Sequence, residues 1–197
     1  TAGRVLMDGV EMTRTAPRER NVAFIFQNGS LYGHYTVEQN LAFALDRQRA
    51  SWGWWGGSSF SNKLTPALSS EQIALRVQEV AERTGITAWL QRRPAELSGG
   101  QQQRVAVARA VGGAPSILLA DEPTGNLDSK NGEAVMELLS ELHREGATIC
   151  MVTHDPRYAD FADRKVFMFD GRVVDEETLH RLRSEEDARI RRAAAGE

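Results

Sequence analysis

The stretch from Leu97 to Glu122 constrains the fold more than any other part of the chain. It begins with the polar loop Leu97-Ser98-Gly99-Gly100-Gln101, in which the serine is followed three residues later by a glutamine. This is the spacing of a capping box, so a helix is expected to begin directly after Ser98. The two glycines leave backbone N–H groups uncovered in the first turn. The start of this helix can therefore approach an anion closely.

The second half of the stretch is the apolar run Ile117-Leu118-Leu119-Ala120, followed by Asp121 and Glu122. The run is too short for a helix and indicates a buried parallel strand with two carboxylates at its carboxyl end. Open α/β sheets bind their ligands at that edge. A phosphate-binding helix start together with an acidic strand end predicts a nucleotide triphosphatase of the α/β class.

The remaining apolar patterns place further elements along the chain. Their spacing predicts strands, helices and one hairpin, which are expected at residues 3–9 (strand), 21–26 (strand), 38–47 (helix), 69–85 (helix), 133–144 (helix), 148–152 (strand), 165–174 (hairpin) and 178–192 (helix). Cys150 is expected to be buried in the strand at 148–152.

Composition excludes several classes of protein. A chain of 197 residues, of which 41 % are hydrophobic, is long enough for one domain with its own core. The formal net charge is −3, whereas nucleic-acid-binding proteins carry a surplus of basic residues, so no nucleic-acid partner is expected. With one cysteine, no disulfide can form within the chain, which fits a reducing cytosol.

Five motifs, taken in order, resemble those of the ATP-binding-cassette (ABC) ATPases. The resemblance extends over roughly residues 3–175, nearly the whole chain. The matching segments are Gln27 for the Q-loop glutamine, Leu97-Ser98-Gly99-Gly100-Gln101 for the signature loop, Ile117 to Glu122 for the Walker B strand, Gly125-Asn126-Leu127-Asp128 for the D-loop, and His154 for the switch histidine.

The resemblance implies a fold as well. It is a P-loop NTPase-type, mostly parallel sheet with an inserted helical signature subdomain. Residues 1–197 are then one ABC ATPase domain, with the helical subdomain at about 36–96 and a charged carboxy-terminal helix at 177–197. The tryptophan-rich segment 51–62 resembles an insertion at the edge of the subdomain. It is either a surface loop or a contact with a partner or a membrane surface.

The resemblance also implies catalytic roles for the acidic strand end. Asp121 would bind Mg²⁺ directly or through a water, and Glu122 would act as general base for the attacking water. Because consecutive strand residues point to opposite sides, the two carboxylates are expected to serve these two tasks separately. Gln27 would bind the metal or orient the water, and His154 would hydrogen-bond the γ-phosphate of ATP.

The signature loop has a different implied role, because ABC ATPases dimerise head to tail. Ser98, Gly99, Gly100 and Gln101 would contact ATP held by the partner domain, and Asp128 would lie across the same interface. The partners implied are a second ABC ATPase domain and transmembrane permease subunits, with the chain on the cytoplasmic face of the cell membrane. Hydrolysis would then drive the permease between two states.

One family motif has no match. No G-x-x-x-x-G-K-[ST] sequence occurs in these residues, although its backbone N–H cradle and lysine hold the phosphates. The expectation is an amino-terminally truncated ATPase that on its own binds ATP poorly and does not turn over. The alternatives are a non-catalytic module that completes a partner's ATP site, and a soluble ABC ATPase outside transport. The substrate and the direction of transport stay open.

Overall fold

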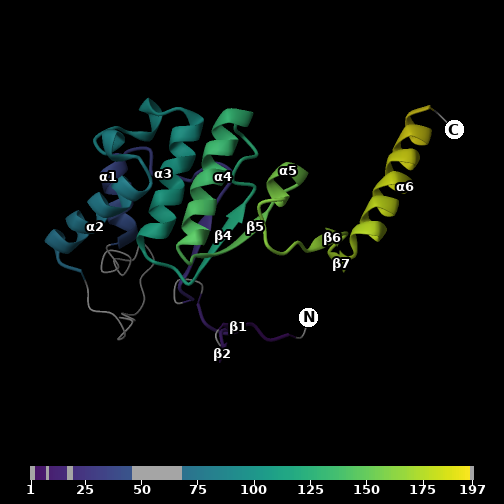
Figure 1. Cartoon of the computed structure of the whole chain (residues 1–197), viewed down its shortest axis with the longest axis horizontal. Helices are drawn as coiled ribbons and strands as arrows, with labels where there is room; N and C mark the ends of the chain where they lie inside the picture. The colour runs from purple at the N-terminus through teal and green to yellow at the C-terminus, as the bar shows by residue number, and fades with distance from the viewer. Residues whose placement is uncertain (1–2, 8, 17–19, 46–67, 196–197) are drawn as a thin grey trace. The chain divides into compact units, whose positions relative to one another are not determined.

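The computed structural model describes residues 3–7, 9–16, 20–45 and 68–195 (Figure 1). The tryptophan-rich segment 51–62 lies outside these residues. The chain forms two compact units, Thr1–His154 and Asp155–Glu197. Each is described by itself.

The first unit is built on a parallel sheet of three strands in the order β3-β4-β5. Its strands are β3 (Val22–Ile25), β4 (Ile117–Asp121) and β5 (Thr148–Val152). The register places Phe24, Leu119 and Cys150 in one row across the sheet. The parallel strand predicted from the apolar run is therefore confirmed, and it is the central one of the three.

Two helices cover one face of this sheet. Helix α3 (Gly99–Gly112) packs against β3, and helix α4 (Ser129–Arg144) packs against α3 and β5 (Figure 1). The buried apolar side chains between these layers form the core. They come from the sheet (Ile25, Leu118, Ala120), from α3 (Val105, Val107, Ala108) and from α4 (Val135, Leu139, Leu142).

The opposite face of the sheet is exposed among the described residues. Phe24 and Phe26 stack there with ring centroids 5.6 Å apart and are about half exposed. On β5, the alternate residues Thr148, Cys150 and Val152 are also exposed. The prediction that Cys150 is buried is therefore wrong, because its side chain belongs to the face that α3 and α4 leave uncovered.

A helical segment precedes α3. It contains α1 (Val37–Leu45), α2 (Ser70–Arg83) and the 3₁₀ turns η3 (Thr87–Trp89) and η4 (Pro94–Glu96). Helix α1 packs against both α2 and α3. The chain ahead of β3 forms a short antiparallel hairpin, β1 (Leu6–Met7) with β2 (Val10–Glu11), where one strand was expected.

The second unit contains α5 (Pro156–Ala159), the hairpin β6 (Phe167–Phe169) with β7 (Arg172–Val174), and α6 (Glu176–Ala195). Asp170 and Gly171 both have positive φ, as the predicted two-residue hairpin turn requires. No helix in the described parts of the chain is long and apolar enough to cross a membrane.

Candidate nucleotide site

The signature loop begins α3 with the predicted capping box. The Ser98 hydroxyl accepts from the backbone N–H of Gln101 at 3.3 Å, and the Gln101 carbonyl oxygen accepts from the backbone N–H of Ser98 at 3.0 Å. Both bonds fix the first turn of the helix. Ser98 and Gly99 are exposed at its start, and Gly100 is buried.

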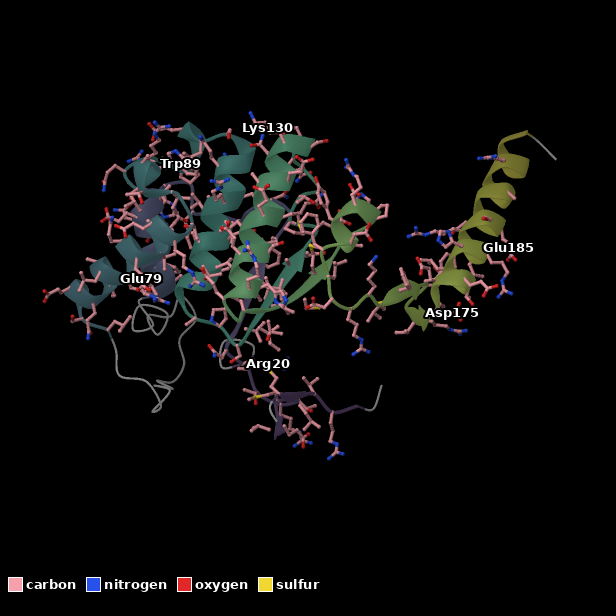
Figure 2. All side chains as sticks on the ribbon, in the orientation of Figure 1. Arg20, Glu79, Trp89, Lys130, Asp175 and Glu185 are labelled. Carbon is pink, nitrogen blue, oxygen red and sulfur yellow. The ribbon has the colours of Figure 1, made fainter. Side chains whose placement is uncertain are left out.

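Gly100 is buried because Asn131, at the start of α4, packs directly on it. A Cβ atom at position 100 would lie 2.5 Å from the Oδ1 atom of Asn131, so only glycine fits here. Asn131 is itself held by Asp128, whose carboxylate accepts from its backbone N–H and from its Nδ2 atom, both at 2.8 Å. The signature loop and Asp128 thus belong to one contact set. Figure 2 marks this end of α4 with Lys130.

Asp128 is the N-cap of α4, and its carboxylate is fully exposed. The backbone N–H and side-chain amide of Asn131 hold the pKa of Asp128 below its usual value. The carboxylate therefore stays charged at the helix start, where negative charge is favourable.

The second contact set lies at the carboxyl edge of the sheet. Strand β4 ends at Asp121, which is exposed, and Glu122 follows with a left-handed φ of +45°. The backbone N–H of Glu122 donates to the carbonyl of Val152 at 2.9 Å. The direction of the Glu122 side chain is therefore set by a turn, and not by the strand alternation that the sequence suggested.

Glu122 meets His154, which follows the adjacent strand β5. The Nδ1 atom of His154 lies 3.0 Å from the Oε1 atom of Glu122, close enough for an imidazole N–H to donate to the carboxylate. The Glu122 side chain is 30 % exposed and that of His154 is 73 % exposed. One oxygen of Glu122 is thus oriented by the imidazole in a position that water can reach.

Gln27 follows β3, the other neighbour of β4, and reaches the same edge. Its Nε2 atom would be 2.7 Å from a Cβ atom at Gly125, and the Oε2 atom of Glu122 would be 3.0 Å from it. Gln27 and Glu122 therefore both lie against the backbone of Gly125. Parallel pairing explains this meeting, since the three strands end at one edge of the sheet.

Sequence reasoning missed Asn126, which contacts Gln27 in the second set. Its Oδ1 atom accepts from the Nε2 atom of Gln27 at 3.3 Å, and its Nδ2 atom donates to the Oδ1 atom of Asn28 at 2.6 Å. Asn126 lies in the short loop that also carries Asp128. The only sequence signal was its place in the motif Gly125-Asn126-Leu127-Asp128.

Two residues of α3 that sequence reasoning also missed hold the segment after Gln27. Gln103 is buried and its Nε2 atom donates to the carbonyl of Phe26 at 3.1 Å. The guanidinium of Arg109 donates to the carbonyls of Ser30 and Gly29 at 2.8 and 3.4 Å. Burial lowers the pKa of Arg109 from its ordinary value, although such a group stays charged at neutral pH.

The oxygen donors at the carboxyl edge of the sheet, from Asp121 and Gln27, suit a small, hard cation only if a ligand supplies further oxygens. Among the described residues no group of three or more histidine, cysteine or acidic side chains could hold a metal. Asp121 and Gln27 offer one carboxylate and one carboxamide at the same edge. This is the type of protein contribution that Mg²⁺ accepts when phosphate oxygens and waters complete its shell.

A family model described as ABC transporter matches residues 1–125. The uncharacterized ABC transporter ATP-binding protein YvrO of Bacillus subtilis is 37 % identical over 183 residues, which cover 90 % of this chain and 72 % of that protein.

Longer relatives match over the same region. The sn-glycerol-3-phosphate import ATP-binding protein UgpC 1 of Rhizobium johnstonii is 39 % identical, with 91 % of this chain and 46 % of that protein covered. The macrolide export ATP-binding/permease protein MacB of Mannheimia succiniciproducens is 37 % identical, with 91 % and 26 % covered. The chain thus spans less than half of UgpC 1 and about a quarter of MacB.

The fold is similar to that of solved cassettes. The ATP-binding cassette MJ0796, in a dimeric post-hydrolysis state bound to ADP and Pi, superposes with a TM-score of 0.68 at 33 % identity. The match covers 89 % of this chain and 72 % of that one.

Proposed function

The chain belongs to the ABC transporter family of ATP-binding proteins, and from this premise we propose which residues hydrolyse ATP and which bind it in a dimer. The family assignment makes the chain a nucleotide-binding ATPase component of a transporter. In this proposal one of the two contact sets described above hydrolyses ATP, and the other binds ATP held by a second domain.

The carboxyl edge of the sheet is the hydrolytic half of the site. Glu122 acts as general base for the attacking water, and His154 holds the Glu122 carboxylate in place. The 3.0 Å contact between these two side chains is the observation that carries this proposal. A positioned general base contributes a rate factor of roughly 10²–10⁴.

Asp121 and Gln27 hold Mg²⁺ in this proposal, directly or through a water. When bound, the ion neutralises charge on the phosphates. Asp121 supplies the carboxylate at the end of β4, and Gln27 supplies an amide oxygen from the end of β3. Both donors are exposed, so a nucleotide can reach them.

Ser98, Gly99, Gly100 and Gln101 form the other half of the site, which serves a second ATPase domain. The backbone N–H groups of Gly99 and Gly100 at the start of α3 and the Ser98 hydroxyl contact the γ-phosphate of ATP held by that domain. Asp128 lies at the same interface. This arrangement is supported by likeness to a cassette solved as a dimer. Membrane-spanning permease subunits are the partners that the dimer would drive.

A complementation experiment tests the composite site. Two variants of the full-length protein, Ser98→Arg and Glu122→Gln, are each expected to lose ATP hydrolysis. In a head-to-tail dimer of the two, one site keeps Glu122 from one copy and Ser98 from the other. Mixing the inactive variants in equal amounts should therefore restore about a quarter of the wild-type rate, because half of the dimers are mixed and each has one intact site.

The matched control is Glu133→Gln, an exposed position on α4 that neither contact set includes. This variant should keep the wild-type rate alone and in the mixture. A mixture of Ser98→Arg and Glu122→Gln that stays inactive, while both variants still dimerise with ATP, would mean that each site is built from one copy only.

A further inference from the structure

The carboxamide of Gln27 is held on one side by the loop that begins at Gly125. Of the carboxamide atoms, nitrogen lies nearest, because Nε2 would be 2.7 Å and Cδ would be 3.4 Å from a Cβ atom at position 125. The absence of a side chain at Gly125 is therefore what lets Gln27 lie against this loop. The oxygen is at the other end of the carboxamide and lies farther from a Cβ atom at this position.

Asn126, the next residue, fixes which end of the carboxamide faces the loop. Its Oδ1 atom accepts from Nε2 of Gln27 at 3.3 Å. A carboxamide has one acceptor end and one donor end, so Asn126 discriminates between the two orientations of Gln27 only if its own orientation is fixed.

Asn28 holds Asn126 in the orientation that the structure shows. Its Oδ1 atom accepts from the Nδ2 atom of Asn126 at 2.6 Å, so the nitrogen end of Asn126 is engaged and its oxygen end is left for Gln27. In this chain of three amides Gln27 donates to Asn126, and Asn126 donates to Asn28. Reversing Gln27 alone would place two acceptor oxygens against each other.

From these hydrogen-bonded amides we propose that Asn126 is a positioning residue, which turns the amide oxygen of Gln27 away from the loop. The oxygen is then available to a cation at the carboxyl edge of the sheet. Mg²⁺ takes oxygen ligands and does not accept an N–H donor, so only this orientation of Gln27 can contribute to its shell. The inference rests on the metal-binding role proposed above for Gln27 and adds the residue that prepares Gln27 for it.

Binding of Mn²⁺ in place of Mg²⁺ to the full-length protein, in the presence of a non-hydrolysable ATP analogue, tests the proposal without requiring turnover. Free Mn²⁺ is measured by electron paramagnetic resonance for wild type, Gln27→Ala, Asn126→Ala and the double variant. Asn126→Ala should weaken Mn²⁺ binding by about threefold to tenfold, the effect expected of one lost hydrogen bond. In the Gln27→Ala background the same change should have no further effect.

The control variant is Gln78→Ala, which removes an exposed amide of α2 that donates to Glu82 and belongs to neither contact set. It should bind Mn²⁺ as the wild type does. The proposal is overturned if Asn126→Ala binds Mn²⁺ normally, or if it weakens binding equally with and without Gln27. In those two cases a weakened Gln27→Ala variant would still support Gln27 as a ligand, whereas normal binding by Gln27→Ala would reject that role and the inference together.

Discussion

At the residue scale, the contact between Gly100 and Asn131 is the tightest constraint in the site. The neighbouring atoms include the Cβ of Asn131, only 2.8 Å from a hypothetical Cβ at position 100. A Cβ atom can move only with its backbone, and Asn131 is tied to Asp128 by two hydrogen bonds. The start of α4 therefore cannot give way to a side chain at this point.

Gly100→Ala is expected to lower the free energy of unfolding by about 1–3 kcal/mol, as overpacking in a rigid site does. Urea denaturation measures this loss. Gly113→Ala is the control, because nothing lies within 4 Å of a Cβ there and φ is −76°. It should be neutral or stabilise the protein by up to about 1 kcal/mol. Equal effects at both positions would contradict the packing argument.

Asn131→Ala should raise the pKa of the Asp128 carboxyl part of the way towards its ordinary value, because it removes the side-chain hydrogen bond from Asn131, while the larger cause, the hydrogen bond from the backbone N–H of residue 131, remains. A depressed pKa stabilises the folded protein above the unfolded pKa, and that contribution is lost as the pH falls through the folded value. The acid side of the stability profile should therefore shift to higher pH in the variant. A titration of the Asp128 carboxyl carbon by nuclear magnetic resonance measures the shift, with Asp175 as internal reference.

At the element scale, the chain carries the same capping box twice, and only one copy lies in the site. Ser69 starts α2 and Ser98 starts α3, each followed three residues later by a glutamine that completes the box. Both substitutions to alanine should cost about 1 kcal/mol of unfolding free energy. Only Ser98→Ala should also reduce ATP hydrolysis by the full-length protein, since Ser69 has no proposed nucleotide contact. A loss of activity in Ser69→Ala beyond its loss of folded protein would contradict this separation.

Adjacent glutamines of α3 are tied to different segments. Gln103 holds the carbonyl of Phe26 after β3, whereas Gln102 holds the carbonyls of Pro94 and Leu97 before the helix. Gln103→Leu should speed amide hydrogen exchange at 27–31, and Gln102→Leu should speed it at 94–98. Each variant thus serves as the control for the other. Faster exchange in both segments in either variant would show that α3 itself had loosened.

Periodicity and capping predicted the elements of this chain well. The spacing of apolar residues placed β4, α2, α4 and the β6–β7 hairpin, and the serine–glutamine spacing placed the first turn of α3. No such pattern predicted the left-handed backbone at Glu122, because this conformation arises where the chain leaves the sheet and not from a local preference of glutamate. The same holds for Ser30, which is held by Arg109 of a distant helix.

At the scale of the whole molecule, the sheet of the first unit has one face packed and one face exposed among the described residues. Sequence reasoning treated 148–152 as a buried strand, since apolar residues fill it on both faces. Such a pattern indicates that a strand can be covered on both sides, but it does not say by what. The exposed row includes Phe24, Cys150 and Val152.

Cys150 of the 197-residue chain should therefore react with a thiol reagent under native conditions, at a rate within about tenfold of that in denaturant, because access governs the reaction of an ordinary thiol. Absorbance of the released aromatic thiolate follows the reaction. The Cys150→Ser variant gives the background. Protection of the thiol until the chain unfolds would show that this face is covered in solution.

The candidate site was partly visible in the sequence for the same large-scale reason. Motifs at the ends of successive parallel strands meet at one edge, so Gln27, Glu122 and His154 could be grouped before their distances were known. Asn126 could not be added, because its role depends on the side-chain amides of Gln27 and Asn28, nearly a hundred residues away in the chain. Pairwise contacts of this kind leave no periodic pattern.

The left-handed turn at Glu122 has an evolutionary consequence. A residue other than glycine costs about 1–2 kcal/mol in this backbone conformation, so a glycine at position 122 would make the protein more stable. It would also remove the proposed general base. Stability and turnover therefore favour different residues at one position, and a lineage released from the need to hydrolyse ATP would gain by losing this carboxylate. In the proposed mechanism, the strained backbone at Glu122 is the cost of keeping a carboxylate at this edge of the sheet.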